Sequence, residues 1–232
     1  MKRRRTLSSK ASSWLFILPA LTVVILLLLY PVTSSIFYSL TNKNLIKPTY
    51  RFLGLDNYIK TLTDPDFWTA FWNDLKWTFF SLLGQLIVGF TGALALNRIK
   101  KGSSIYRTIL IIPWAIPSIV LAFSWKWILN GVYGFLPNLL IKLGLCSTAP
   151  EFLTGNLAFA TLVFIIILFG SPLIMVNILS ALQTVPKDQY EAAQIDGANT
   201  FQSFWHITVP HIRTVVGLLV VLRTIWIFNS FD

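Results

Sequence analysis

The stretch "EAAQIDGANTFQSFWHITVP" (residues 191–210) is polar and hinged at a glycine, yet it lies between two runs of sequence that are almost entirely apolar. A short turn would be enough to join two such runs. The length and polarity of the stretch therefore indicate a segment that projects from the apolar part of the protein and has a role of its own.

The rest of the chain has the composition of an integral membrane protein. Of its 232 residues, 55% are hydrophobic and only 12% are charged, and the chain contains 9 Trp and 18 Phe. A soluble domain of this length needs more charge to cover its surface. We therefore predict an all-α, polytopic transmembrane helical bundle. The apolar runs that can cross a bilayer, which takes about 20 helical residues, are residues 14–38, 75–96, 105–129, 157–182 and 212–228.

Several functional classes receive no support from the sequence. The net charge of +10 comes from basic residues at the ends of apolar runs, where anionic lipid headgroups explain them, so we expect membrane lipid and no nucleic acid as a partner. His206 and His211 match no metal-ligand spacing, and the single Cys146 excludes an intrachain disulfide and a Cys-rich metal site. The 9 carboxylates lie in loops or at span ends, which argues against a membrane enzyme and against an ion-coupled secondary transporter.

The distribution of Lys and Arg predicts the orientation. The N-terminal "MKRRRTLSSK" precedes an apolar run without an A-x-A-like cleavage site, so we expect an uncleaved first span with the N-terminus in the cytoplasm. With this orientation residues 191–210 also face the cytoplasm. The loops on that side carry more Lys and Arg than the outer loops, as expected of cytoplasmic loops. The basic residues assigned inside are Lys2, Arg3, Arg4, Arg5, Lys10, Arg98, Lys100, Lys101, Arg107, Lys187 and Arg213. Those assigned to the outer loops are fewer: Lys43, Lys47, Arg51, Lys60 and Lys142.

Two features outside the polar stretch predict local structure. The outer loop at about 41–71 mixes Asp with aromatic residues, as expected of a short interfacial helix. In the second span, Gly89 and Ala93 have the small-x-x-x-small spacing that lets helices approach closely. Ordinary helix packing explains that spacing.

Prolines predict interruptions in two spans. Pro113 and Pro117 lie one turn apart in the third span, and each removes a backbone hydrogen bond, so we expect a kink or a broken helix there. We expect a similar interruption at "GSP" (residues 170–172) in the fourth span. Discontinuous helices can line a substrate path, but proline kinks also occur in purely structural spans.

The polar segment itself predicts two short helices at an angle. Pro186 suits the first turn of one helix, and Gly197 is placed to end it, since glycine adopts positive φ without a Cβ clash. Asn199 with Gln202 resembles a capping box for the second helix, and Pro210 precedes the fifth span. Such a helix–turn–helix is suited to docking. An amphipathic loop lying on the bilayer is the alternative. The apolar residues of the second helix that face the membrane are Phe201, Phe204, Trp205 and Ile207.

The segment resembles the EAA motif of the membrane subunits of binding-protein-dependent ABC importers. Two departures are Val209, where Leu is usual, and Thr214, where many members have a second Pro. A match of this many residues at fixed spacing on the predicted cytoplasmic side is a specific signal. The matching residues are Glu191, Ala192, Ala193, Asp196, Gly197, Ala198, Ile207 and Pro210.

The resemblance extends along the whole chain and favours the carbohydrate-uptake branch, in the manner of maltose-type and glycerol-phosphate-type permeases. The stretches "FLGLDNY", "DPDFW", "IPWAIPSIVLAFSWKWILNGVYGFLPNLL" and "WIFNSFD" are similar to that branch, whereas Leu168 departs from a frequent Trp. Family members continue into a sixth span, so the chain looks truncated at its C-terminus. The implied organisation is a cytoplasmic N-terminus (1–11) and a transmembrane domain (12–232) with its coupling loop at 183–211.

The resemblance implies a multi-pass protein of the bacterial plasma membrane that is not itself an enzyme. ATP would be bound by a cytoplasmic ATPase dimer, because this chain has no GxxxxGK[ST] phosphate-binding loop and needs no cofactor of its own. The other implied partners are a second homologous permease and an extracytoplasmic sugar-binding protein. The residues expected to couple to the ATPase are Glu191, Ala192, Ala193, Asp196, Gly197, Ala198 and Pro210.

Substrate contacts are expected from polar and aromatic side chains in the middle of the later spans. Arg223 is a charge within a span, which indicates function or a buried partner. A helix–helix hydrogen bond is the alternative role for Asn177. The substrate-path candidates are Asn177, Arg223, Trp226 and Asn229. Two other interpretations stay open: an ABC importer for another solute, such as an amino acid, phosphate or a polyol, and a non-functional truncated fragment.

Overall fold

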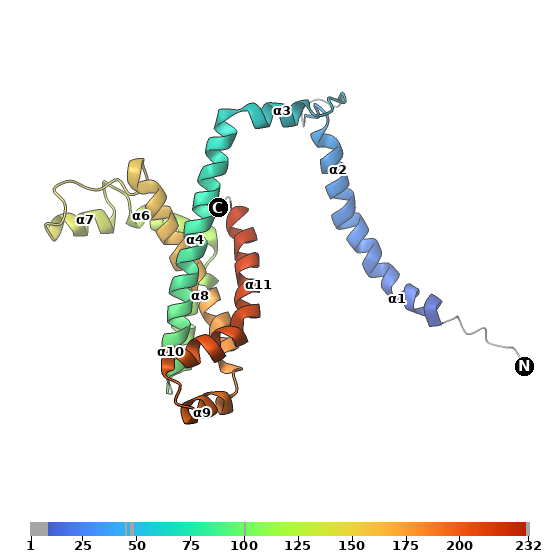
Figure 1. The fold of residues 1–232 in the computed structure, drawn as a ribbon. Helices are drawn as coiled ribbons and strands as arrows, with labels where there is room; N and C mark the ends of the chain where they lie inside the picture. Colours follow the sequence, from blue (N-terminus) through green and yellow to red (C-terminus); the bar gives the residue numbers. More distant parts are fainter. Residues whose placement is uncertain (1–8, 45, 47–48, 100, 231–232) are drawn as a thin grey trace, which may run out of the picture. The chain divides into compact units, whose positions relative to one another are not determined.

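The computed structural model describes residues 9–44, 46, 49–99 and 101–230. The chain divides into two compact units, Met1–Ala70 and Phe71–Asp232. Over the described residues the regular structure is helical, apart from an isolated antiparallel bridge between Thr41 and Phe52 (Figure 1). This confirms the predicted all-α class.

The first unit contains the first apolar span. It comprises α1 (Ser9–Val24), the π-helical turn η1 (Ile25–Leu29) and α2 (Tyr30–Ser39). Its apolar part, Phe16–Ser39, has a mean hydropathy of 2.4, and none of its residues is buried within this unit. A helix of this length and hydropathy can cross a bilayer, so the predicted first span is confirmed.

A short helix follows the first span, as the aromatic outer loop predicts. This helix is α3 (Asp56–Thr63), and it starts the stretch that leads into the next span. The Nδ2 atom of Asn57 donates to the carbonyls of Ser39 and Thr41, both at 2.9 Å. These carbonyls lie at the C-terminal end of α2 and past it, where helix carbonyls lack intrahelical partners. Asn57 therefore anchors α3 to the end of the span.

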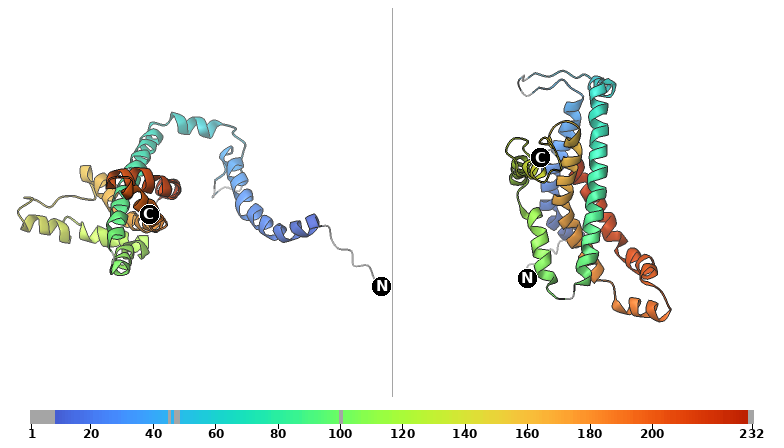
Figure 2. Two further views of the ribbon diagram at one scale, coloured as in Figure 1. Left: turned by 60° about the horizontal axis from the view of Figure 1, so that its bottom comes forward. Right: turned by 90° about the vertical axis from the view of Figure 1, so that its left-hand side faces the viewer.

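The second unit is a helical bundle in which α4, α8 and α11 lie side by side, with α9 and α10 at one end (Figures 1 and 2). With the first span, these helices confirm four of the five predicted spans, and the bent pair α5–α6 gives the fifth if it is counted as one span. The elements are α4 (Pro65–Arg98, which starts in the first unit), α5 (Ser103–Ala115), α6 (Ser118–Ile128), α7 (Phe135–Lys142), the 3-10 turn η2 (Gly155–Leu157), α8 (Ala158–Gln183), α9 (Lys187–Ile195), α10 (Thr200–Ser203), the π-helical turn η3 (Phe204–Thr208) and α11 (Val209–Phe228).

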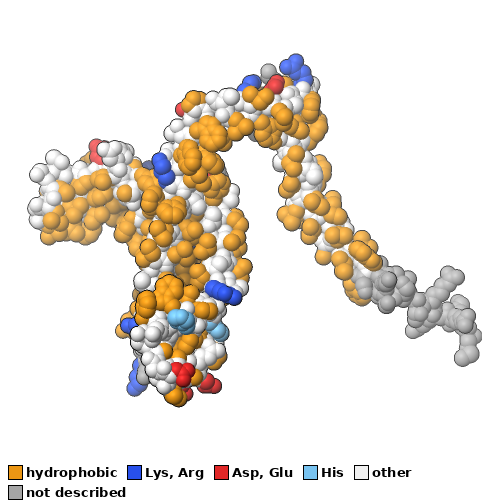
Figure 3. Space-filling model, in the orientation of Figure 1, with side chains coloured by type: hydrophobic (Ala, Val, Ile, Leu, Met, Phe, Trp, Pro, Cys, Tyr) orange, Lys and Arg blue, Asp and Glu red, His pale blue; other side chains and the backbone are white. Residues whose placement is uncertain are grey.

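The helix α8 is the centre of the second unit, because α5 and α11 both pack against it. Its Ile174 and Ile178 are fully buried, and they form a core with Ala93 of α4 and Ile212 of α11. Many other large apolar side chains stay exposed and cover much of the helix surface (Figure 3). That surface is suited to lipid or to other subunits, whereas the histidine side chains visible on this face lie near α9 and α10, together with some of the acidic ones (Figure 3).

Glycines on α4 allow it to lie close to α8. A Cβ added to Gly89 would come within 2.7 Å of Cγ2 of Ile174 and 3.0 Å of the Ser171 carbonyl, and one added to Gly92 would contact Met175. Membrane helices associate through such close backbone approach, since lipid tails remove the hydrophobic driving force between them. The predicted role of Gly89 in packing is therefore confirmed.

The third span is broken, as its prolines predict. The break falls at Ile116 and Pro117, where both residues take extended ψ values, and α5 and α6 meet at an angle of 89°. A residue before proline is disfavoured in the helical region, which accounts for the conformation of Ile116. Pro113, in contrast, lies inside α5 without ending it.

The interruption predicted at "GSP" in the fourth span is wrong. Gly170, Ser171 and Pro172 are buried within α8, which runs unbroken from Ala158 to Gln183. Proline removes one backbone donor, but neighbouring helices can hold a membrane helix straight despite that loss. The packing of α4, α5 and α11 around α8 provides such support, whereas α5 and α6 contain no buried residue.

The contact between Gly89 and α8 gives a test of this packing. Substituting Gly89→Leu should lower the free energy of unfolding by about 1–3 kcal/mol, because overpacking forces the helices apart. Gly217→Leu on α11 is the control, since no atom lies within 4 Å of a Cβ built there. Thermal midpoints of the two detergent-purified variants give the comparison. Equal midpoints would contradict the close α4–α8 packing.

Candidate functional site

The candidate site is the polar segment between α8 and α11, residues 183–211, which we call the coupling segment. The first predicted helix is present as α9. The second differs from the prediction: α10, η3 and α11 form one continuous span, Thr200–Phe228. Pro210 does not separate them, because it occupies the first turn of α11, and the π-helical turn precedes it. Proline is tolerated in a first turn, where its missing N–H matters least.

Gly197 makes the sharp turn between α9 and α10. Its φ is +80°, and two hydrogen bonds close the end of α9: Ala198 N donates to Ala193 O at 2.8 Å, and Gly197 N donates to Gln194 O at 3.1 Å. This pair of bonds is a Schellman motif, which satisfies the last carbonyls of a helix and requires a left-handed residue. The predicted helix end at Gly197 is therefore confirmed.

The second helix is capped as predicted. Asn199 Oδ1 accepts from the backbone N–H of Gln202 at 2.9 Å, and Asn199 N donates to Gln202 Oε1 at 2.8 Å. This reciprocal pair is a capping box, which satisfies two backbone donors at a helix start. Together with the Schellman motif, it fixes both sides of the turn, so α9 and α10 hold a defined angle.

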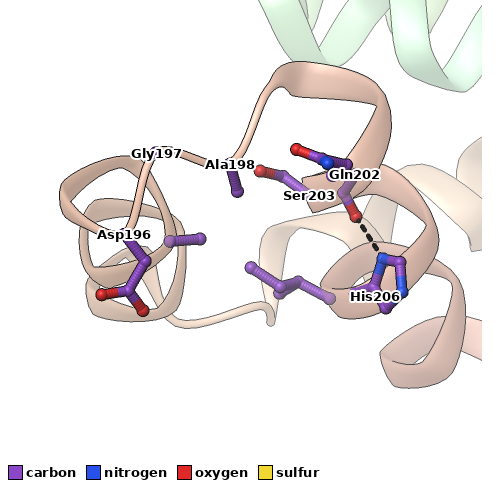
Figure 4. A pocket seen from close by; sticks show the side chains of 8 residues that line it. Asp196, Gly197, Ala198, Gln202, Ser203 and His206 are labelled. Atoms are coloured by element: carbon purple, nitrogen blue, oxygen red, sulfur yellow. Dashed lines mark hydrogen bonds between the residues drawn. The ribbon is translucent and has the colours of Figure 1, made fainter.

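The matching EAA residues lie on the surface of the coupling segment. Glu191, Ala192, Asp196 and Gly197 are exposed. Between α9 and η3 the segment encloses an open hollow of about 320 Å³ (Figure 4). Asp196 lies on one side of it, and Gln202, Ser203 and His206 lie on the other (Figure 4). The hollow is lined by Ala193, Asp196, Gly197, Ala198, Gln202, Ser203, His206 and Ile207.

Two side-chain hydrogen bonds hold the coupling segment together at its base, and one ring contact joins it to α4. The hydroxyls of Tyr190 and Thr208 share a hydrogen bond of 2.7 Å between α9 and η3. Thr184 Oγ1 and His211 Nε2 lie 3.1 Å apart and join the end of α8 to the start of α11. Neither pair was predicted from the sequence, and nothing in the spacing of the four residues indicates it. The third contact joins the segment to α4: the rings of Phe90 and Phe204 form an edge-to-face pair with their centroids 6.0 Å apart.

The aromatic residues of the second predicted helix lie beside the end of α4. Phe201 and Trp205 are exposed, and Phe204 is half-buried. They line a groove of about 650 Å³ together with Arg98 of α4. An aromatic and basic groove of this kind suits the headgroup region of a membrane. This placement is compatible with the prediction that these rings face the membrane.

Within the bundle, Arg223 and Gln85 form a buried polar pair. Arg223 donates from Nε at 2.9 Å and from Nη2 at 2.6 Å to Oε1 of Gln85. Gln85 in turn donates from Nε2 to the carbonyl of Ile166 in α8 at 3.0 Å. Arg223 is 5% exposed and Gln85 is fully buried. The predicted buried partner of Arg223 therefore exists, and it is a neutral amide 138 residues away.

The other substrate-path candidates are placed differently. The ring of Trp226 is exposed and lies 5.6 Å from Cζ of Arg223, so these two candidates lie together. Asn177 donates from Nδ2 to Leu173 O at 2.8 Å within α8, not to another helix. Asn229 donates in the same way to Ile225 O at 2.8 Å within α11. Gln85 was not predicted as the partner of Arg223, although an amide in the middle of the second span is a signal for such a role.

A second hollow lies next to Ile166. Its volume is about 330 Å³, and its walls combine indole rings with a lysine and two hydroxyls. Trp77 of α4 and Trp125 of α6 contribute the indoles, and Lys126 contributes the charge. Apolar walls with a few polar groups are typical of small-molecule sites. In the described parts of the chain, His, Cys, Asp and Glu form no cluster of three or more that could hold a metal ion.

Comparison with known proteins identifies the family. A family model described as the binding-protein-dependent transport system inner membrane component matches residues 85–232. The chain is 36% identical over 219 residues to the trehalose/maltose transport system permease protein MalF of Thermococcus litoralis, covering 94% of this chain and 74% of that protein. It is 32% identical over 219 residues to the sulfoquinovosyl glycerol transport system permease protein SmoG of Agrobacterium fabrum, covering 94% and 71%.

A solved structure has the same fold. The chain superposes with a TM-score of 0.78 on a chain of a bacterial ABC transporter involved in the import of the acidic polysaccharide alginate, at 23% identity, covering 94% of this chain and 73% of that one. The family match and the sequence relatives agree with this fold. The chain therefore belongs to the family of binding-protein-dependent transport system inner membrane components, and it is a membrane-spanning transport permease.

Proposed function

We propose that this chain is the permease subunit of an ATP-driven carbohydrate importer and that its coupling segment docks on a cytoplasmic ATPase. The observation that carries the proposal is the exposed, rigid turn around Gly197, with Glu191 and Asp196 free on its surface. Two capping motifs fix its shape, and its second helix continues into α11. A rigid element with two positions is a common means of coupling a binding event to a distant one.

The chemistry of the coupling segment suits a protein partner. Glu191 would supply a charge-assisted hydrogen bond to a basic or amide group of the ATPase, which is stronger than a bond between neutral groups. Ala192 and Ala193 leave a flat helix face that another backbone can approach. When ATP closes the ATPase dimer, the segments of this chain and of a second, homologous permease would move together. The spans would then tilt between inward and outward openings.

The orientation follows from the basic residues at the span ends. The N-terminus and the coupling segment would lie in the cytoplasm, and Cys146 would lie on the outer side of the bacterial plasma membrane. An extracytoplasmic binding protein would deliver the substrate to that outer side. Support comes from the alginate transporter, which has also been crystallised in complex with a periplasmic protein carrying an alginate pentasaccharide.

The substrate class follows from the relatives and from the hollow near Ile166. Two relatives are named as transport proteins for trehalose or maltose and for sulfoquinovosyl glycerol, which are carbohydrates or contain one. Saccharides bind proteins through aromatic stacking and polar hydrogen bonds, and the walls of this hollow offer both. Arg223, Trp226, Asn177 and Asn229 remain our candidates for the substrate path.

Charge reversal at Glu191 tests the docking. In affinity purification from native membranes, Glu191→Lys should abolish recovery of the ATPase while the second permease stays bound, because the cation repels the basic surface that the carboxylate contacts. The matched control is Glu151→Lys, an equal charge change in the loop before α8. Recovery is measured by mass spectrometry of the co-purifying proteins. If Glu191→Lys retains as much ATPase as Glu151→Lys, docking through this segment is wrong.

Two substitutions of similar size separate backbone strain from collision at Gly197. No atom of the chain lies within 4 Å of a Cβ built there, but its φ of +80° costs most residues about 1–2 kcal/mol. We expect Gly197→Val to reduce ATPase recovery strongly and Gly197→Asn only partly, because Asn adopts the left-handed conformation more readily. Equal loss in both variants would show that the partner fills the space instead.

The single native cysteine tests the orientation. A membrane-impermeant maleimide should label Cys146 in cells whose plasma membrane is intact. In a Cys146→Ser background, a cysteine introduced by Gln194→Cys in α9 should react only after the membrane is permeabilised. Labelling of the Gln194→Cys variant in intact cells would place the coupling segment outside and contradict the proposal.

A further inference from the structure

The polar pair in the bundle connects three helices at one point. Arg223 belongs to α11, Gln85 to α4 and Ile166 to α8, and they are linked by the hydrogen bonds of 2.6–3.0 Å described above. We propose that Gln85 is a positioning residue and that the Gln85–Arg223 pair is a latch, which holds α11 against α4 and α8 in the resting transporter. This inference rests on the proposed function, because the coupling segment is what would open the latch.

The hydrogen bonds allow only one orientation of the Gln85 amide. Its oxygen accepts two N–H groups of Arg223, and its nitrogen donates to the carbonyl of Ile166. A flipped amide would set donors against donors on the guanidinium side and an oxygen against the carbonyl on the other. Since the side chain of Gln85 is also fully buried, it is fixed in position and fixes Arg223 in turn.

Gly170 makes room for the pair against α8. A Cβ built on Gly170 would collide with Nη2 of Arg223 and with the amide of Gln85. The glycine of "GSP" therefore does not break the helix. It lets the guanidinium and the amide lie directly on the α8 backbone. A shift of α11 along α8 would therefore pull Arg223 away from Gly170 and Gln85.

The chemistry of the pair allows it to open. A buried arginine–carboxylate pair would leave two unpaired charges when broken, which is costly in a low-dielectric interior. Breaking the Gln85–Arg223 pair leaves a neutral amide and a single cation. That cation has a second partner nearby, because the exposed ring of Trp226 lies 5.6 Å from Cζ of Arg223 on the same helix. Arg223 can thus keep this cation–π contact, which moves with α11, when its hydrogen bonds to Gln85 break.

The coupling segment is connected to the latch by one helical span. Thr200–Phe228 contains α10, η3 and α11. A push on the turn at Gly197 is therefore transmitted along this span to Arg223. The contacts Tyr190–Thr208 and Thr184–His211 hold the N-terminal part of the span to α9 and to the end of α8. Opening the latch would free the C-terminal part of α11, which contains Arg223, while these contacts keep its N-terminal end attached to the coupling segment.

ATP hydrolysis by the assembled transporter, without binding protein or saccharide, tests the latch. The complex is purified from native membranes with its partners and placed in lipid nanodiscs with MgATP as the only ligand. The double variant Gln85→Leu with Arg223→Leu removes both polar groups and leaves no unpaired charge. We expect its basal hydrolysis rate to rise about tenfold, because the resting arrangement is no longer held.

A conservative variant covers the case in which the double variant fails to assemble. Gln85→Glu keeps the shape of the side chain and turns the latch into an ion pair. The attraction between the carboxylate and the guanidinium should outweigh the lost donation to the Ile166 carbonyl, so the basal rate should fall about tenfold. Thr91→Leu is the control on the same helix, since Thr91 is exposed and bonds only to carbonyls of α4. Its basal rate should equal that of the wild type, which would attribute the changes to position 85.

The outcomes separate the latch from a packing role. A double variant or a Gln85→Glu variant that assembles and hydrolyses ATP at the wild-type rate overturns the inference, because a purely structural pair would affect yield and not rate. ATPase recovery with the wild-type chain is measured in the same preparation. A missing ATPase overturns the proposed function and the latch together, whereas unchanged rates in a complete complex overturn the latch alone.

Discussion

The requirement that Arg223 be satisfied inside an apolar bundle shapes the second unit. A guanidinium at membrane depth needs a partner, and here it finds the amide of Gln85 and a surface free of side chains at Gly170. To bring these groups together, α4 and α11 must both lie close to α8. The glycines on α4 serve the same purpose at neighbouring turns. The packing of the bundle and the burial of Arg223, the one buried charge among the described residues, are thus one arrangement.

The same helices connect the membrane interior to the coupling segment. The segment is neither a loose loop nor a separate domain, because α8 leads into it and α11 continues from it without a break. Its turn is fixed by a Schellman motif and a capping box, and its base is fixed by hydrogen bonds to the ends of α8 and α11. A force on this segment is therefore expected to move α11 and not to bend the turn.

Local features of the site were predictable from the sequence, whereas long-range pairings were not. Gly197, Asn199 and Gln202 act through hydrogen bonds to neighbouring residues, so their spacing alone predicted both ends of the turn. The partner of Arg223 lies 138 residues away, and no periodicity points from one to the other. Gln85 was recognisable only as an unexplained amide within a span.

The proline predictions show where local rules stop. The break at Pro117 was predicted correctly because no buried residue holds α5 and α6 in line there. The same rule was wrong at Pro172, where packing on several sides of α8 outweighs one missing hydrogen bond. Pro210 was also placed wrongly as a boundary, since a first helical turn accepts it. Tertiary packing, which a single sequence does not display, decided the first two cases, whereas the position of Pro210 within its helix decided the third.

The central claim is that α11 moves relative to α4 when ATP acts on the coupling segment, and a distance measurement tests it directly. Spin labels would replace Val88 on α4 and Val221 on α11, both exposed, in a Cys146→Ser background. Pulsed electron paramagnetic resonance on the assembled transporter would compare the nucleotide-free state with the state trapped by ATP and vanadate. We predict that the distance distribution shifts beyond its resting width. Identical distributions in the two states would contradict the account.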